Sequence, residues 1–285
     1  MLARDACKVA PAGGDCRSMK IRSDARWLVA GLCALHLVVS TSPASGAPAC
    51  SAASSRDTLP LVELYTSEGC DSCPPADRWL SATYPAGGTA TASVLAFHVD
   101  YWDRLGWKDR FASPQFTARQ YASMRANGAT FVYTPQVLVQ GRDVDSTRRS
   151  HAADAALAAR SQPTRAMLRV DAAGFDEGPT SVRVRASVAD KSARKDAALW
   201  LAYTDSGLSS DVKAGENRGV RLTHDHVVRS LYGPYPVDEA GEVVANVAVT
   251  PPSERGRFPS LVAFVQNGAT GEVLQTLTLP ACPRS

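Results

Sequence analysis

The sequence predicts an α/β region followed by an antiparallel, β-rich region with a sandwich-like arrangement. Between about residues 58 and 162, short apolar runs alternate with helical patterns, which is typical of α/β layer structures. From about residue 164 to 280 the pattern changes to short runs of strand character separated by Gly, Asp, Asn and Pro. We therefore predict two domains, at residues 48–163 and 164–285, after an N-terminal segment 1–47.

Three strands are predicted in the first region. Residues 59–65 and 93–99 are continuous apolar runs of the length expected for buried strands. Residues 134–141 form a third run, which ends in a turn at Gly141. A helical pattern separates each pair of runs, and this alternation is the basis of the α/β prediction.

Three helices are predicted in the same region. Residues 76–82 form a short helix with apolar contacts on one side. A longer helix begins at Ser113-Pro114, because Ser is a good helix cap and Pro fits the first helical position, and Asn127-Gly128 ends it. The alanine-rich residues 146–159 form the third helix, which stops before Pro163.

The second region is predicted to consist of strands. Period-two alternation of apolar and polar residues is clearest at residues 181–188, as expected for a strand with one buried face. Several short strands of this kind separated by turn residues favour an antiparallel sandwich. The predicted strands are residues 167–170, 181–188, 199–203, 243–249, 261–265 and 273–277.

The N-terminal segment has the features of an export signal. The apolar run 27–39 is too short to span a bilayer comfortably, and Lys20, Arg22 and Arg26 precede it. Small residues at 45–47 fit the preference of signal peptidase. We therefore expect removal of residues 1–47 and a periplasmic or secreted protein. The alternative is an N-terminal membrane anchor that is retained.

Removal of this segment changes the charge balance. Met19, followed by a lysine, is a better start for such a signal than Met1. Residues 1–47 hold six of the 31 basic and three of the 28 acidic residues, which leaves 25 of each. A nearly neutral chain gives no reason to expect nucleic acid or an anionic surface as a partner. No later apolar run approaches membrane-spanning length, so no stable membrane insertion is expected after signal removal.

The strongest chemical signal is a C-x-x-C motif formed by Cys70 and Cys73, directly after a predicted strand and before a predicted helix. The positive end of a helix dipole favours a thiolate, which is the species that attacks disulfides. We therefore assign Cys70 as the attacking thiol and Cys73 as the resolving thiol. Glu68 and Asp71 oppose a thiolate by their charge, so the sequence predicts a weakly oxidising site, nearer a reductant or isomerase.

Two other interpretations of the motif stay open. A C-x-x-C can be an inert structural disulfide, or it can contribute two ligands to a metal site. Because no second C-x-x-C follows, a zinc site with four cysteines is excluded within one chain.

The remaining cysteines predict a structural disulfide. Of seven cysteines, three lie in the predicted signal, and Cys50 and Cys282 stand near the two ends of the remaining chain. Spare thiols tend to pair in an oxidising compartment, and chain ends often lie close together. We predict a Cys50–Cys282 bridge, worth roughly 5 kcal/mol in the chain-entropy treatment of long loops. The alternative is two unpaired cysteines on frayed ends.

The order of a strand, a C-x-x-C at a helix start and a later strand that begins with Thr134-Pro135 resembles the thioredoxin fold. In that fold a cis-proline faces the two cysteines, and the residue before it pairs with the backbone of bound substrate. The resemblance implies these roles for Pro135 and Thr134. An aromatic-rich insertion at about residues 100–133 and the two prolines at 74–75 depart from ordinary thioredoxins.

Several motifs are, more specifically, similar to those of domain-of-unknown-function family 1223. They are ELYTSEGCDSCPPAD at residues 63–77, FHVDYWD at 97–103, GWKD at 106–109, FASP at 111–114, YTPQ at 133–136 and, more weakly, the segment from GENRG at 215–219 to VVR at 227–229. This resemblance covers nearly the whole chain after the signal. It implies a thioredoxin-like region in an exported protein, and it implies no activity.

Two further residues are candidates for the site. Thioredoxins keep a buried acid below the disulfide as proton acceptor for the resolving thiol, and Glu63, inside an apolar strand, is the candidate here. The alternative is a strand residue that faces solvent or pairs with an arginine. Thioredoxin-like copper proteins combine two near-adjacent cysteines with one distant histidine, so Cys70, Cys73 and His98 form an alternative copper(I) site. A lone histidine at a strand end also has a purely structural explanation.

His224 and His226 alternate around Asp225. If residues 222–229 form one strand, both histidines face the same side of it. We expect them to pack at the surface across neighbouring strands, and a metal shared between them is the alternative.

The sequence thus predicts an exported protein that acts by dithiol–disulfide exchange on a protein or small-molecule thiol or disulfide, without a cofactor. One alternative is a copper-binding or copper-delivery module. The other is a non-catalytic binding protein that uses its β-rich region.

Overall fold

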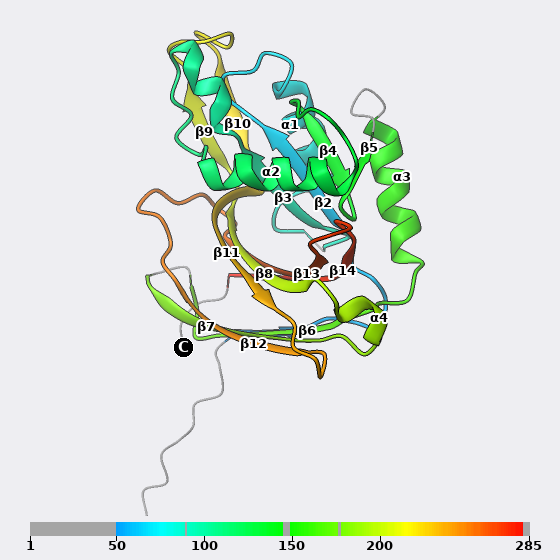
Figure 1. Ribbon diagram of the computed structural model, residues 1–285. Coiled ribbons are helices and arrows are strands. Elements are labelled where there is room, and N and C mark those ends of the chain that lie inside the picture. The colour runs from blue at the N-terminus through cyan, green and yellow to red at the C-terminus, as the bar shows by residue number, and fades with distance from the viewer. Residues whose placement is uncertain (1–49, 89, 145–148, 176–177, 282–285) are drawn as a thin grey trace, which may run out of the picture. The chain divides into compact units, whose positions relative to one another are not determined.

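The computed structural model describes residues 50–88, 90–144, 149–175 and 178–281 (Figure 1). The predicted export signal and Cys282 lie outside the described residues. Within these ranges, no helix combines the length and the apolar character needed to cross a membrane.

The helices and strands follow the predicted alternation and then the predicted run of strands. The helical elements are α1 (Pro74–Thr83), the 3₁₀ helix η1 (Asp100–Leu105), α2 (Pro114–Ala126), α3 (Arg149–Arg160) and α4 (Lys191–Arg194). The strands up to α3 are β1 (Cys50–Ala53), β2 (Leu61–Thr66), β3 (Ser93–His98), β4 (Gln136–Val139) and β5 (Arg142–Val144). The later strands are β6 (Met167–Ala172), β7 (Thr180–Ser187), β8 (Ala197–Asp205), β9 (Leu208–Asp211), β10 (Arg221–His224), β11 (Val227–Pro236), β12 (Glu242–Val249), β13 (Ser260–Asn267) and β14 (Val273–Pro280).

These strands form one mixed sheet and two antiparallel sheets, so the protein is of mixed α/β class. The eight-stranded sheet has the order β14-β13-β8-β11-β3-β2-β4-β5. In this sheet β3 pairs parallel with both β2 and β11, and the other neighbours are antiparallel. The four-stranded sheet has the order β1-β6-β7-β12, and β9 and β10 form a hairpin.

The eight-stranded sheet runs across the predicted domain boundary at residue 163. Strand β11 joins the edge of β3, where Val227 is the partner of Ala96 and the Ala96 N–H donates to the His226 carbonyl at 2.8 Å. Strands β8, β13 and β14 then extend the sheet. The two predicted regions are therefore joined by backbone hydrogen bonds within one sheet.

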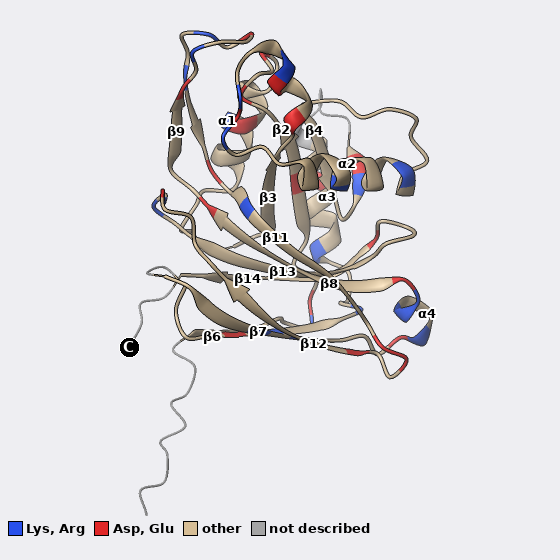
Figure 2. Cartoon of the chain, turned by 60° about the vertical axis from the view of Figure 1, so that its left-hand side comes forward, with Lys and Arg blue, Asp and Glu red and all other residues tan. Residues whose placement is uncertain are grey.

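Alternation along the central strands fills a core on each side of the sheet. In β8, Leu199, Leu201 and Tyr203 pack against the four-stranded sheet, whereas Trp200 and Ala202 pack in the core on the opposite face. The first core thus lies between two β-sheets, as period-two alternation requires. Basic and acidic residues are interspersed along the elements (Figure 2).

The helices lie on both faces of strands β2 and β3, next to the loop with the two cysteines (Figure 1). Apolar residues of α1 and α3 pack with Val62 and Leu64 on one face. On the other face, Phe116 of α2 packs with Tyr65 and Phe97. Even-numbered residues of β2 therefore face α1 and α3, and odd-numbered residues face α2.

Helix α2 begins as the sequence predicts. The Ser113 hydroxyl accepts a hydrogen bond from the Gln115 N–H at 3.2 Å, and Pro114 takes the first helical position. The helix ends at Asn127, and Gly128 follows with a φ of 66°, a conformation in which glycine carries no steric cost. The predicted cap and terminator of this helix are confirmed.

A buried ion pair joins β2 to α2. The Arg119 Nε donates to Glu63 Oε1 at 2.8 Å, and the two side chains are 6% and 0% exposed. The guanidinium also donates to Gln266 Oε1 at 3.0 Å and lies 5.0 Å from the ring centroid of Phe264. Each charge is costly to bury alone, so each depends on the other.

We predict that Arg119→Met destabilises the fold by roughly 3–5 kcal/mol, because it leaves the Glu63 carboxylate buried without a counter-charge. The double variant Glu63→Leu/Arg119→Met should recover much of that loss, since both charges are then absent. Urea unfolding monitored by circular dichroism measures both effects. Arg125→Met, on the exposed side of the same helix, is the control and should change stability by less than about 0.5 kcal/mol. A double variant as unstable as the single one would contradict the prediction.

Candidate active site

The two cysteines of the C-x-x-C motif form a disulfide at the start of α1. Their Cα atoms are 5.5 Å apart, and the Cys73 N–H donates to the Cys70 carbonyl at 3.3 Å. Strand β2 ends at Thr66, and the turn that follows brings both sulfurs to the carboxyl-terminal end of the strand. The structure thus pairs the two residues that the sequence predicts to act together.

The helix offers few hydrogen-bond donors to these sulfurs. Cys73 occupies the cap position of α1, and the first two helical residues, Pro74 and Pro75, have no N–H. The next N–H groups, of Ala76 and Asp77, donate to the Cys73 carbonyl at 2.8 and 3.1 Å. Backbone donors that stabilise a thiolate at other helix starts are therefore missing or occupied here, which lowers the expected stabilisation of a thiolate.

Thr134 and Pro135 lie against the disulfide, as the resemblance implies. The Thr134–Pro135 peptide bond is cis. The Thr134 hydroxyl donates to Cys70 Sγ at 3.4 Å, and the Ser72 hydroxyl lies 3.3 Å from the same sulfur. The Thr134 carbonyl oxygen is 4.0 Å from this sulfur, on the side where a reduced thiol would donate to it. Side-chain hydroxyl groups thus replace the missing backbone donors at Cys70.

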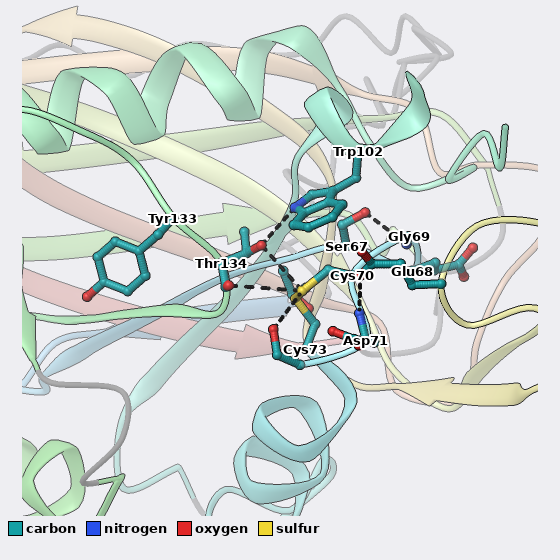
Figure 3. Close-up of a disulfide and its surroundings, with 12 residues drawn as sticks. Ser67, Glu68, Gly69, Cys70, Asp71, Cys73, Trp102, Tyr133 and Thr134 are labelled. Carbon is teal, nitrogen blue, oxygen red and sulfur yellow. Dashed lines mark hydrogen bonds between the residues drawn. A yellow bond between two sulfur atoms is a disulfide. The ribbon is translucent and has the colours of Figure 1, made fainter. Parts of the chain in front are cut away.

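Both sulfur-bearing residues are sealed from solvent. Cys70 and Cys73 are each 0% exposed. Trp102, from η1, extends across the disulfide toward Thr134, and its indole N–H donates to the Thr134 hydroxyl at 2.8 Å (Figure 3). A Cβ on Gly69 would lie 3.1 Å from the Cβ of Trp102, so the glycine permits this close approach. The aromatic insertion predicted at residues 100–133 therefore covers the disulfide.

The hairpin β9–β10 holds the loop that carries the cysteines. The Asn217 side-chain amide donates to the carbonyls of Glu68 and Cys70 at 2.9 and 2.8 Å. The Glu216 carboxylate accepts from the Asp71 N–H at 3.0 Å. The weak motif at residues 215–219 thus belongs to the disulfide site, which the sequence alone did not reveal.

A buried polar cluster lies on the other side of this loop. Glu68 is 0% exposed, accepts from the Trp107 indole N–H at 2.7 Å, and has its second oxygen 3.2 Å from His224 Nε2. Burial acts to raise the pKa of Glu68, but the contacts with His224 and Trp107 outweigh it and hold the pKa below its ordinary value. A carboxylate therefore stays ionised two residues before Cys70.

His98 and Asp109 form the second pair of the cluster. His98 Nδ1 and Asp109 Oδ2 are 2.7 Å apart, and the Asp109 carboxylate also accepts from the N–H groups of Glu68 and Phe111. Burial alone would lower the pKa of His98, but the charge and hydrogen bond of Asp109 outweigh it and raise the pKa. Burial acts in the opposite sense on Asp109, where His98 holds the pKa below its ordinary value.

The two histidine rings lie edge to face with their centroids 5.0 Å apart. Among the described residues, His98 Nε2 and both ring nitrogens of His224 have no hydrogen-bond partner of good geometry. Polar atoms this deeply buried usually have a hydrogen-bond partner, so these three ring nitrogens are an exception.

Asp77 is a buried carboxyl on the α1 side of the sheet. It stands one helical turn after Cys73, and its Oδ2 accepts from the Thr66 hydroxyl at 3.2 Å. Burial raises the pKa of Asp77, and His224 and His98 only partly offset that rise. Sequence reasoning placed this residue in the first turns of a helix and missed its burial; its spacing of four from Cys73 is the signal that could have indicated it.

Glu63, in contrast, is not brought to the cysteines. It shares the α2 face of β2 with Tyr65, whereas α1 packs on the opposite face. Its carboxylate is compensated by Arg119. The geometry therefore favours the arginine-pairing alternative for Glu63, and the buried acid near Cys73 is Asp77.

The described residues do not form the grouping that the alternative copper site requires. His98 turns Nδ1 to Asp109, and both cysteine sulfurs are bonded to each other. In the described part of the chain, no three His, Cys, Asp or Glu side chains are grouped so that they could hold a metal ion.

The alternating histidines also differ from the prediction. Strand β10 ends at His224 and β11 begins at Val227, with His226 between them at a φ of 57°. His224 is buried against Glu68, whereas His226 Nε2 is 2.7 Å from the Tyr84 carbonyl. The expectation that both face one side of a strand at the surface is wrong, because the chain turns between them.

The predicted Cys50–Cys282 bridge lies partly outside the described residues. Cys50 is buried at the start of β1, and Ala281 packs against the same core. Residue 281 thus reaches the core that holds Cys50, but the pairing itself stays a prediction.

Fold and site together define a mixed α/β protein with a C-x-x-C disulfide at a helix start, opposite a cis-proline. The model of a protein family described as "Protein of unknown function (DUF1223)" matches residues 61–266. The chain belongs to this family, as its motifs suggested.

Two solved structures share the fold. Protein AGR_C_4864 from Agrobacterium tumefaciens is 25% identical, with a TM-score of 0.54, over 79% of this chain and 96% of that one. HBP35 of Porphyromonas gingivalis is 12% identical, with a TM-score of 0.58, over 79% of this chain and 75% of that one, and shows the fold alone. No curated protein matches the chain.

The pKa of His98 predicts a pH dependence of stability. A histidine whose pKa is raised on folding stabilises the protein below its unfolded pKa of about 6.5 and loses that contribution as the pH rises through the folded value. We expect the stability difference between the wild type and His98→Asn, which keeps a donor to Asp109, to shrink above about pH 6.5.

Urea unfolding of both proteins from about pH 5 to 9 measures this difference, and each unit of pKa shift corresponds to about 1.4 kcal/mol. His151→Asn, on the exposed side of α3, is the control for the same substitution away from the buried cluster. A flat difference for His98→Asn would show that the imidazole is not stabilised in its charged form.

Proposed function

We propose that the protein is an exported thiol–disulfide exchange protein, reductant or isomerase-like, whose first region is thioredoxin-like. The contact of the Thr134 hydroxyl with Cys70 Sγ at 3.4 Å, in front of a cis-proline, carries this proposal. A disulfide that is only structural does not require a residue such as Thr134, in front of a cis-proline, beside one of its sulfurs. The predicted signal at residues 1–47 supports the exported setting.

The topology supports the thioredoxin-like assignment. Strands β3-β2-β4-β5 are neighbours in that order, with β2 and β3 parallel and β4 antiparallel to β2. Helix α1 leads from β2 with the C-x-x-C motif at its start, and α2 covers the opposite face. The cis-proline directly precedes β4.

The proposed exchange has two steps. In the reduced protein, the Cys70 thiolate attacks a substrate disulfide, a Cys70–substrate bond forms, and one substrate sulfur leaves as a thiolate. The Cys73 thiol then loses its proton and attacks Cys70 Sγ, which closes the Cys70–Cys73 disulfide and releases the second substrate thiolate. Two electrons pass to the substrate, and a dithiol donor returns the protein to its reduced form.

Asp77 is the proposed acceptor of the Cys73 proton. Its position one turn after Cys73 and its raised pKa suit a carboxyl that takes up a proton in the interior. The ionised Glu68 and the prolines at the helix start disfavour a thiolate at Cys70. A poorly stabilised thiolate corresponds to a stable disulfide, and therefore to a reductant rather than an oxidant.

Access to the sulfur requires movement of Trp102. The indole covers the disulfide, donates a hydrogen bond to Thr134 and packs against the core that contains Tyr65 and Phe97. Its displacement therefore costs the hydrogen bond, about 0.5–1.5 kcal/mol, together with this packing, and both must be offset by contacts with the substrate. In the proposal, substrate backbone takes the place of the indole in front of Thr134.

The burial of both sulfurs favours one competing function. An inert disulfide that staples the start of α1 to β2 would also be sealed, and the protein would then act only as a binding protein. The two following experiments separate these functions.

A trapping experiment tests the exchange directly. We predict that Cys73→Ala, reduced and then incubated with oxidised glutathione or a disulfide-bonded peptide, accumulates a mixed disulfide at Cys70, because no resolving thiol is present. Mass spectrometry under non-reducing conditions detects the adduct, and dithiothreitol should remove it. The matched variant Cys70→Ala should give about tenfold less adduct in the same time. Equal labelling of the two variants, or no labelling, would contradict the assignment of Cys70 as nucleophile.

The covering role of Trp102 predicts a change in rate. Trp102→Ala should speed reduction of the Cys70–Cys73 disulfide by dithiothreitol about tenfold, equivalent to about 1.4 kcal/mol of activation free energy. Stopped-flow fluorescence or thiol-alkylation time courses measure the rate. Trp79→Ala, which removes a partly buried tryptophan packed on Tyr84 at the far end of α1, is the control and should leave the rate nearly unchanged. Equal rates in wild type and Trp102→Ala would argue against the indole as the barrier.

A further inference from the structure

A second candidate site lies away from the cysteines, between the start of α2, β11 and the β12–β13 connection. The cavity has a volume of about 400 Å³ and is lined by Arg110, Ser113, Gln115, Arg229, Ser230 and Pro252, among others. This volume is within the range of about 300–1,000 Å³ that is usual for small-molecule sites. None of the lining residues is acidic.

Two guanidinium groups converge on one aromatic ring in its wall. The Cζ atoms of Arg110 and Arg229 lie 4.5 and 5.1 Å from the ring centroid of Phe111. Two like charges against the same ring repel each other, so the arrangement requires negative charge nearby.

The carboxylates of the protein meet this requirement only in part. Glu254 pairs with Arg110, and both side chains of that pair are partly exposed. Asp205 is 3.9 Å from Arg229, but its oxygens already accept from the N–H groups of Gly256 and Ser206 at 2.6 and 2.9 Å. Burial raises the pKa of Asp205, and these hydrogen bonds and Arg229 act against that rise.

Arg229 is the less compensated of the two arginines. Its side chain is 12% exposed, and its hydrogen bond among the described residues goes from Nη1 to the Glu254 carbonyl at 3.2 Å. A guanidinium has five N–H donors, and its planar fork fits two oxygens of an oxyanion. Burial lowers the pKa of Arg229, and Asp205 and Glu254 only partly offset this shift.

The start of α2 adds positive potential to the same cavity. This helix has 13 residues, and its cap residue Ser113 is part of the cavity wall. Its first N–H groups are taken by the hydroxyl and carbonyl of Ser113, so the helix contributes only its dipole beside the two arginines. The helix start and the two arginines thus both favour an anion in this cavity.

We propose that this cavity binds the phosphate group of a small molecule. A phosphate oxyanion would accept hydrogen bonds from Arg229 and lie close to the charge of Arg110, and the cavity has room for the small organic group to which the phosphate is attached. Arg229 is the principal ligand, through paired N–H donors, and Arg110 contributes charge at the rim. The site is independent of the proposed thiol exchange, since neither cysteine lines the cavity.

Isothermal titration of the oxidised protein with inorganic phosphate, and then with glycerol 3-phosphate, tests the proposal at constant ionic strength. We expect saturable binding of one molecule, tighter for the ester than for the free ion, and at least tenfold weaker binding to Arg229→Gln, equivalent to about 1.4 kcal/mol. Equal affinity for both ligands would assign the site to the free ion. Arg229→Lys should bind with intermediate affinity, because it keeps the charge and loses the fork.

Arg185→Gln, which removes an exposed arginine paired with Asp171 on the four-stranded sheet, is the control and should bind normally. Thermal unfolding without ligand shows whether each variant is folded, and Arg110→Gln replaces Arg229→Gln if the latter is not. The proposal is overturned by an absence of saturable binding to the wild type, or by equal affinity of the wild type and the folded arginine variants.

Discussion

The disulfide loop depends on hydrogen bonds from residues far along the chain. Asn217 holds the carbonyls of Glu68 and Cys70, and Asp109 accepts from the Glu68 N–H. Buried backbone groups need such partners, and a loop of seven residues between a strand and a helix cannot supply them itself. The position of the cysteines is therefore set by the insertion and by the hairpin β9–β10, as well as by β2 and α1.

The same constraint explains the cluster of buried charges. Asp109 can serve the loop only as a carboxylate, and His98 supplies the compensating charge from the end of β3. His224 lies 3.2 Å from the Glu68 carboxylate in the same cluster, and Trp107 donates a hydrogen bond to Glu68. Ionisable groups that appear in the sequence as scattered polar residues thus form one unit, because each is costly to bury without the next.

Local pattern was sufficient to predict much of the fold. Apolar runs and caps gave β2, β3 and α2 close to their observed bounds, because these elements follow from neighbouring residues. The alternation at residues 181–188 likewise gave β7. The pairing of Cys70 with Cys73 and their closeness to Thr134 followed from motif spacing and from resemblance to a known fold.

The remaining features depend on contacts that no local pattern encodes. Strand β11 contains Gly233-Pro234 and two breaks in register, so its sequence does not read as a strand, although pairing with β8 and β3 makes it one. The position of Trp102 over the sulfur depends on its close approach to Gly69. The burial of Asp77, Asp109 and His224 likewise follows from which elements meet in space. The sequence therefore predicted the cysteine pair and not most of its surroundings.

The pairing of β11 with β3 has a consequence for how the molecule is made. The edge of β3 stays unpaired until Val227 pairs with Ala96. The core below the cysteines also contains Val228, Val262 and Phe264, so the first 163 residues lack part of their own interior. During synthesis this half of the chain emerges with an open strand edge and an incomplete core, and it must wait for more than sixty further residues. Contacts of such long range slow folding, and the growing chain is open to wrong pairing or proteolysis in the meantime.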